Sequence, residues 1–245
     1  MMEMVFLITK KMKIITEIKK ELAQEIELNY KDGCQRFFKE EIKLLGVRTP
    51  KTRKIAKKYF QHIKKLEKKE IYKICEELLD TNISEYRTIA FDWIYKLKNT
   101  HTKEDFNRFD KWLKKYVKNW ASCDDFCTHT LGFLLRKYPE LYENNKKWSK
   151  SKNRWERRAA AVTIIHPLKK GEFLNKSFEI AKIMMQDEED MVQKGYGWML
   201  KEAANKYQKE VFAFVMKYKE TMPRTALRYA IEKMPKEMKL KAMKK

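Results

Sequence analysis

A polar or charged residue recurs about every 35 residues through most of this 245-residue chain. The intervals are 34, 37, 34, 36 and 34 residues, between Arg53, Arg87, Asp124, Arg158, Lys194 and Arg228. Four of these positions begin a short run of small and apolar residues, as in Arg158-Ala-Ala-Ala. Because strand-like alternation is nearly absent, a period of this size indicates one helical unit that is stacked several times.

The period predicts an all-α protein: a right-handed α-solenoid of HEAT-like helical hairpins, with equivalent positions along one basic concave face. We expect one domain over residues 1–245, because no Gly-, Ser- or Pro-rich linker interrupts the pattern. An N-terminal helix is expected at about 13–29, followed by a turn at Lys31-Asp-Gly. The expected repeats cover 34–60, 68–96, 104–137, 140–165, 172–206 and 208–232.

Capping residues predict where two helices begin. Thr49 precedes Pro50, which places Thr49 at the N-cap and Pro50 at the first helical position. Ser122 is followed three residues later by Asp125, which predicts a helix that begins near Ser122. Trp120 then lies just before this helix and Asp124 in its first turn, where the helix dipole is expected to keep the carboxylate ionised.

The chain carries 56 Lys and Arg against 34 Asp and Glu, a net charge of +22. Codon usage in an AT-rich genome raises the lysine content, but it does not explain so large an excess over acidic residues. The charge therefore predicts a polyanionic partner. Hydrophobic residues make up 43% of the chain, enough to bury a continuous core.

Cysteine usage and hydropathy favour a cytoplasmic protein. The four cysteines, Cys34, Cys75, Cys123 and Cys127, have no disulfide-framework spacing, and reduced thiols are expected. Only His129 lies near the last two, so we expect neither a metal nor another cofactor. The N-terminal apolar run is a poor signal peptide, and no stretch approaches the roughly 18 apolar residues that span a bilayer.

Asp124 is the one acidic residue among the six repeat positions. Trp120 precedes it by four residues, and Trp198 follows Lys194 by four. Stacking in register would place this carboxylate between two indoles, with the Arg158 guanidinium beside it. Taken singly, such an Asp is more often a dipole partner, and such tryptophans more often pack the core. Their convergence on neighbouring repeats favours a functional site.

Three segments carry a family resemblance: Asn119-Trp120-x-x-x-Asp124, Arg154-Trp-Glu-Arg-Arg158-Ala-Ala-Ala and Val192-Gln-Lys-Gly-Tyr-Gly-Trp198-Met-Leu-Lys-Glu. In this order and spacing the chain resembles the DNA alkylation repair enzymes of the AlkD type, which are HEAT-like repeat DNA glycosylases. The resemblance implies that Asp124 is the catalytic carboxylate and that Trp120 and Trp198 contact the lesion nucleotide. It also implies that Arg158 is a phosphate or carboxylate partner. Ala121 departs from the family, where many relatives carry Asp.

The resemblance implies a monomeric enzyme of base excision repair that removes cationic N3- or N7-alkylated purines from duplex DNA without enclosing a flipped base. A carboxylate and indole faces suit a cationic transition state, and little acid catalysis is needed because the alkylated base is a good leaving group. The expected DNA-binding residues are Arg48, Arg53, Arg87, Arg154, Lys194, Lys201, Arg224 and Arg228.

Two other functions stay open from the residues alone. The chain could be a non-catalytic HEAT-repeat protein that binds nucleic acid, or a HEAT scaffold that binds an acidic protein. A carboxylate at the centre of a basic face favours the enzyme over the nucleic-acid binder, because it would repel DNA. The cationic repeat positions disfavour the scaffold.

Overall fold

The computed structural model describes residues 2–244, with side chains from residue 12 onward. The described residues form helices and their connections, with no β-strand among them, so the prediction of an all-α protein is confirmed. The chain divides into two compact units, Met1–Thr100 (unit 1) and His101–Lys245 (unit 2). The single domain expected over residues 1–245 stays a prediction.

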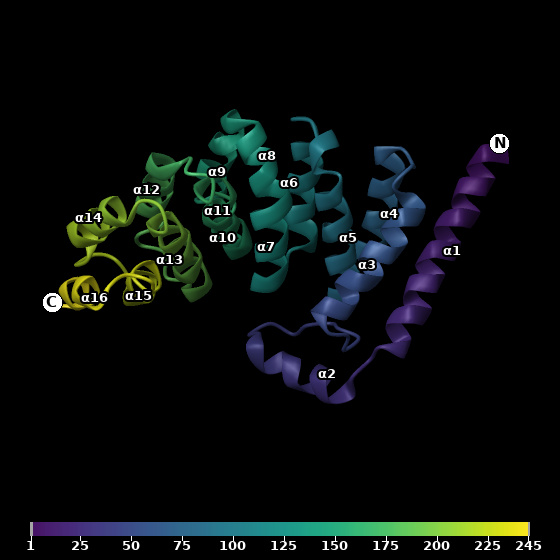
Figure 1. Ribbon diagram of the computed structural model, residues 1–245, viewed down its shortest axis with the longest axis horizontal. Helices are drawn as coiled ribbons and strands as arrows, with labels where there is room; N and C mark the ends of the chain where they lie inside the picture. The colour runs from purple at the N-terminus through teal and green to yellow at the C-terminus, as the bar shows by residue number, and fades with distance from the viewer. Residues whose placement is uncertain (1, 245) are drawn as a thin grey trace. The chain divides into compact units, whose positions relative to one another are not determined.

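Unit 1 is built on amphipathic helices that bury one face. In chain order its α-helices are α1 (Met2–Gln24), α2 (Leu28–Cys34), α3 (Thr49–Ile63), α4 (Lys68–Asp80) and α5 (Ser84–Lys96). Helix α5 packs against both α3 and α4, and α1 packs against α3 (Figure 1). The fully buried Trp93 indole of α5 donates to the carbonyl of Ala56 in α3 at 2.8 Å.

A buried carboxylate holds the segment that leads into α3. Glu85 is buried in α5 and accepts hydrogen bonds from the backbone N–H groups of Leu45, Gly46 and Val47 at 2.8–3.0 Å. Gly46 has a φ of +105°, a conformation that favours glycine. The anchored loop fixes where α3 begins.

Three local predictions in unit 1 were wrong by a few residues. Helix α3 has Arg48 at its N-cap and Thr49 as its first residue, one position earlier than the Thr49-Pro50 pattern predicted. The expected turn at Lys31-Asp-Gly lies inside α2, and the N-terminal helix ends at Gln24 instead of about 29.

Unit 2 contains the remaining helices. They are α6 (Asp105–Tyr116), α7 (Trp120–Phe126), α8 (Gly132–Lys137), α9 (Tyr142–Trp148), α10 (Arg154–Val162), α11 (Ile165–Leu168), α12 (Leu174–Ile183), α13 (Asp190–Ala204), α14 (Gln208–Tyr218), α15 (Arg224–Ala230) and α16 (Lys236–Met243). A π-helical segment, Cys127–Leu131, continues α7 into α8. Helix α13 packs against α10, which precedes it in the chain, and against α15, which follows it.

In unit 2, residues that are about one sequence period apart contact each other. The Trp148 indole donates to Asp110, 38 residues earlier, at 2.9 Å. The Lys137 ammonium donates to the carbonyl of His101, 36 residues earlier, at 2.7 Å. The Tyr207 hydroxyl reaches the carbonyl of Gly171 across the same separation of 36 residues. Successive repeats in this unit therefore stack so that equivalent positions touch.

Candidate active site

Helix α7 begins two residues earlier than its sequence predicted. The cap is Asn119, whose side chain accepts from the Ser122 N–H at 2.9 Å, while the Ser122 hydroxyl accepts from the Asn119 N–H at 3.4 Å. This reciprocal capping box makes Trp120 the first helical residue. Asp124 is consequently the fifth residue of α7 and not in its first turn, so the helix dipole does not explain its ionisation.

Arg158 of α10 binds Asp124 of α7 through two parallel hydrogen bonds. Its Nε lies 2.8 Å from Oδ1 and its Nη2 lies 2.9 Å from Oδ2. The Arg158 side chain is 7% exposed, whereas that of Asp124 is 19% exposed. This geometry holds the carboxylate in one orientation while leaving part of it open to solvent.

The third guanidinium nitrogen of Arg158 reaches the next repeat, where Nη1 donates to the carbonyl of Met191 in α13. Gly195 lies one turn farther along α13, and a Cβ at this position would come within 3.1 Å of the Arg158 Cγ. A larger residue at this position would force the Arg158 side chain to shift by a few tenths of an ångström, so glycine lets α13 lie close to the arginine. Arg158 therefore ties three successive repeats together, and in the free protein its partners are the Asp124 carboxylate and a backbone carbonyl.

Burial and the ion pair have opposite effects on the charged forms of Asp124 and Arg158. Burial raises the pKa of Asp124 above its usual range, and the hydrogen bonds and charge of Arg158 offset only part of that rise. Burial disfavours the charged form of Arg158, but the contacts with Asp124 more than compensate, so the pKa of the guanidinium is raised. Arg158 is therefore the group that favours the ionised form of the buried carboxylate.

The six tryptophans fall into two groups. Trp93, Trp112, Trp148 and Trp155 are buried and pack the core. Trp120 and Trp198, the two proposed to contact the lesion, are only half-buried. Trp120 lies one helical turn before Asp124 on the same face of α7. Four tryptophans therefore pack the core, whereas Trp120 and Trp198 keep part of their surface open to solvent.

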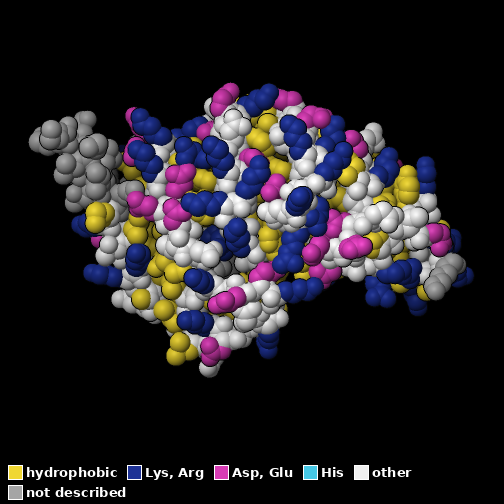
Figure 2. Space-filling view, turned by 180° about the vertical axis from the view of Figure 1, so that it is seen from behind, with side chains coloured by type: hydrophobic (Ala, Val, Ile, Leu, Met, Phe, Trp, Pro, Cys, Tyr) yellow, Lys and Arg dark blue, Asp and Glu magenta, His cyan; other side chains and the backbone are white. Residues whose placement is uncertain are grey.

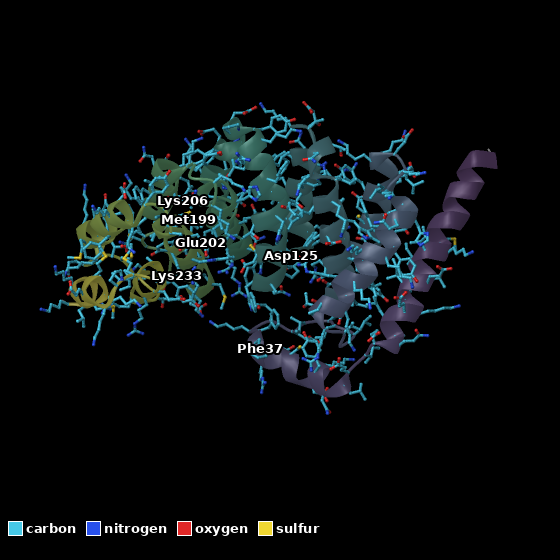
Figure 3. The ribbon with its side chains drawn as sticks, in the orientation of Figure 1. Phe37, Asp125, Met199, Glu202, Lys206 and Lys233 are labelled. Carbon is cyan, nitrogen blue, oxygen red and sulfur yellow. The ribbon has the colours of Figure 1, made fainter. Side chains whose placement is uncertain are left out.

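Trp198 lies on the face of α13 that meets Arg158. Residues four and seven positions apart on a helix share one face, which aligns Met191, Gly195 and Trp198. The indole of Trp198 donates to Glu202 Oε1 at 3.1 Å. Sequence reasoning missed Glu202; its spacing of four from Trp198 was the available signal. Figure 3 labels Glu202 on α13 and Asp125, the neighbour of Asp124, on α7.

The π-helical segment after Asp124 was not predicted. Its wider turn leaves backbone carbonyls unpaired by the α-helical pattern, and side chains bind two of them. The Thr128 hydroxyl donates to the carbonyl of Asp124 at 2.7 Å, and His129 Nδ1 donates to the carbonyl of Asp125 at 2.8 Å. His129 also pairs with the Asp125 carboxylate at 3.4 Å.

The expected cationic residues differ in their exposure. Arg48, Arg224 and Arg228 are exposed, whereas Arg53, Arg154 and Lys194 are half-buried. Several have acidic partners: Arg48 with Glu27, Arg53 with Asp92, Arg154 with Glu189 and Lys194 with Asp190. Figure 2 shows Lys and Arg side chains across the face seen there, with Asp and Glu side chains between them.

Two of the expected DNA-binding cations are not placed at an open surface. Arg87 is 5% exposed, and burial lowers the pKa of its guanidinium. Lys201 is largely covered and bonds Glu232 at 2.8 Å. Burial of Arg87 therefore argues against its expected role in DNA binding, whereas Arg158 contacts a carboxylate, one of the two partners expected for it.

Other features bear on the class of protein. The four cysteines are free thiols, and no group of three or more metal-binding side chains occurs among the described residues. Within residues 2–244, no helix combines the length and apolar character that a membrane span requires.

The chain belongs to the DNA alkylation repair enzyme family, whose sequence pattern it matches over residues 18–234. Among solved structures it is similar to one described as a predicted DNA alkylation repair enzyme from Enterococcus faecalis. The TM-score is 0.77 at 16% sequence identity, covering 86% of this chain and 98% of that chain. At this identity the likeness establishes the fold. The comparison with curated proteins gives no match.

Proposed function

We propose that this protein is a DNA glycosylase that hydrolyses the N-glycosidic bond of cationic N3- or N7-alkylated purines in duplex DNA. The observation that carries the proposal is the Asp124–Arg158 pair: an oriented carboxylate that is buried enough to be desolvated and still 19% exposed. The family, the half-buried Trp120 and Trp198 on the adjoining faces, and the net charge of +22 support the same function.

In 7-methylguanine the purine already carries a positive charge. The bond between C1′ and N9 breaks, its electron pair moves to N9, and the base leaves neutral. The sugar is left with oxocarbenium character, which a fixed carboxylate at Asp124 stabilises electrostatically. Water then adds its oxygen to C1′, and the proton it loses passes to Asp124 or to solvent, leaving an abasic site.

The remaining residues of the site contribute to this step by positioning the carboxylate, the nucleotide or the duplex. Arg158 holds Asp124 and occupies its inner side, so only the outer edge can meet the sugar. The faces of Trp120 and Trp198 attract cations, with a contribution of about 0.5–2 kcal/mol each depending on desolvation. Exposed cations such as Arg224 and Arg228 bind backbone phosphates, which position the duplex without reading sequence.

The test is single-turnover release of 7-methylguanine from a duplex by Asp124→Asn. The amide keeps the shape but loses the charge and basicity, so release is expected to fall about 10²–10³-fold. Duplex binding is expected to be unchanged or slightly tighter, because a negative charge leaves a basic surface. Asp125→Asn is the matched control, since its partner is His129 and not Arg158.

Near-wild-type release by Asp124→Asn would contradict the role of the carboxylate. Absence of release by the wild-type protein, with duplex binding intact, would instead favour a non-catalytic nucleic-acid binder. A duplex with uracil serves as a third substrate: neutral uracil leaves poorly without acid assistance, so efficient uracil release would show that the mechanism is wrong.

A further inference from the structure

A second carboxylate of unit 2, Glu202, is bonded to the indole of Trp198. Its Oε1 accepts from Trp198 Nε1 at 3.1 Å, and its Oε2 accepts from the Asn205 amide at 3.1 Å. The Glu202 side chain is only 13% exposed. The mechanism described above does not use this group, although a shielded polar group of this kind needs hydrogen-bond partners.

Glu202 lies on the face of α13 that meets Arg158. It is one turn beyond Trp198 and two turns beyond Gly195, so all three residues share that face. The two oxygens have separate donors, which fixes the carboxylate, and the carboxylate in turn fixes the indole plane. A hydrogen bond from a neutral N–H to a carboxylate is also stronger than one to a neutral acceptor.

We propose that Glu202 is a specificity-determining positioning residue, which orients Trp198 and makes its ring a site for a cationic group of the nucleotide. This inference rests on the proposed function for the identity of that group, the charged base or the oxocarbenium-like sugar. The physical reason is that an indole face already attracts cations, and a carboxylate on its N–H adds a negative charge at the edge of the ring. A neutral nucleotide gains little from either.

Other charged groups near Glu202 do not cancel this effect. Lys233, in the turn after α15, lies 4.0 Å from Glu202 Oε1, at the limit of an ion pair, and its side chain is mostly exposed. Water therefore screens the ammonium more than the carboxylate. The adjacent Lys201 bonds Glu232 instead. Figure 3 labels Glu202 and Lys233 in this part of unit 2.

The experiment compares two duplexes of one sequence, each carrying an abasic sugar analogue. One analogue is a pyrrolidine with a protonated ring nitrogen, and the other is its uncharged tetrahydrofuran counterpart. Wild-type protein is expected to bind the pyrrolidine duplex more tightly. In Glu202→Gln, which keeps an oxygen acceptor for the indole but loses the charge, the ratio of the two dissociation constants is expected to fall roughly three- to thirtyfold.

Two further variants make the comparison specific. Glu232→Gln removes an exposed carboxylate of the same region that pairs with Lys201, and it is expected to leave the ratio unchanged. Trp198→Phe keeps a ring without an N–H, so it is expected to lower the ratio as well. Adding Glu202→Gln to Trp198→Phe should then have no further effect.

The hydrogen bond itself is read by ¹⁵N NMR of the indole groups. The chain has six tryptophans, so six indole N–H signals are expected, and the one lost in Trp198→Phe identifies Trp198. In Glu202→Gln this signal is expected to shift while the other five stay, which also shows that the variant is folded. An unshifted signal would overturn the inference.

Outcomes for this inference and for the proposed function are separable, because binding of the analogues needs no base release. Wild-type release of 7-methylguanine together with equal ratios in wild type and Glu202→Gln would overturn the role of Glu202 alone. No release, but a ratio that depends on Glu202, would leave a cation-selective nucleotide site and remove the glycosylase. A wild-type protein that binds both duplexes equally would overturn the inference whether or not it releases base.

Discussion

Unit 1 and unit 2 each contain an arginine at a repeat position that is only 5% exposed, and the two differ in what they bind. Arg87 of α5 donates to the side chain of Asn82 at 2.6 Å, and its Nε has no partner among the described residues. Arg158 of α10 binds both oxygens of Asp124 and a backbone carbonyl. The first arginine meets a neutral amide, whereas the second meets a countercharge.

The difference between these two arginines shows which feature indicates a functional site. Burial lowers the pKa of Arg87, because nothing nearby compensates for the lost hydration. The pKa of Arg158 is raised, because Asp124 more than offsets the same loss. A buried guanidinium alone therefore has no functional meaning in this fold. The carboxylate that Arg158 holds, which remains partly open to solvent, is what distinguishes the second position.

Removal of the guanidinium from unit 2 gives the largest expected effect. Arg158→Met leaves the Asp124 carboxylate buried without its partner, which is expected to lower the free energy of unfolding by about 3–5 kcal/mol. Thermal or urea unfolding at neutral pH measures it. Release of 7-methylguanine should be lost as well, because the carboxylate is no longer oriented.

The pH dependence of that loss checks its cause. Without Arg158 the pKa of Asp124 rises further above its unfolded value, so the instability is fully expressed above the folded pKa. It shrinks as the pH falls through that pKa and the carboxyl becomes neutral. The double variant Asp124→Asn/Arg158→Met should recover much of the stability at neutral pH. A deficit that is equal at all pH values would show that Arg158 acts by packing.

The next effect concerns the reaction in wild-type protein. The proposed mechanism requires ionised Asp124, and burial raises the pKa of this group despite Arg158. Release of 7-methylguanine is therefore expected to decline on the acid side at a pH above the usual range of an aspartate, by about tenfold per pH unit below the pKa. No loss is expected on the alkaline side near neutrality, because Arg158 stays charged. Single-turnover rates, corrected for spontaneous depurination, give the profile.

Much of this comparison could be predicted from the sequence, for an identifiable reason. A period of about 35 residues sets which positions of stacked hairpins coincide, and Asp124 and Arg158, one period apart, are in contact as expected. The period does not show how deeply each repeat position is buried. It could not tell that Arg87 is buried or that Arg158 binds a backbone carbonyl of the next repeat as well as Asp124.

Finer features depended on contacts that a sequence pattern does not encode. Asn119 and Ser122 both cap well, and only the reciprocal bonds show that the helix begins at Trp120. The π-helical turn after Asp124 has no sequence signature comparable to a capping box. Glu202 follows Trp198 by four residues in the sequence. Such an i,i+4 pair can be interpreted only when it is known which face of the helix the two residues occupy.

The same replacement in unit 1 is expected to have a small effect. Arg87→Met loses the hydrogen bonds to Asn82, but it also removes a desolvated charge and an unpaired buried N–H. These terms oppose each other, so the free energy of unfolding should change by no more than about 1 kcal/mol. Unfolding measured beside Arg158→Met gives the contrast directly. A loss as large as that of Arg158→Met would mean that the two arginines are equivalent and that Asp124 is not the deciding partner.

The smallest expected effect separates buried cations from exposed ones in DNA binding. Arg228 is exposed on α15, whereas Arg87 is buried in α5. If Arg228 neutralises one phosphate, Arg228→Ala should make the slope of log affinity against log salt shallower by about 0.9, with only a modest loss of affinity at moderate salt. Arg87→Met should leave the slope unchanged, because a guanidinium that cannot reach the surface displaces no counterion. Titrations of an undamaged duplex at several salt concentrations measure both slopes. Equal shifts in the two variants would show that Arg87 becomes accessible in the complex, and the distinction between the two kinds of arginine would then hold only for the free protein.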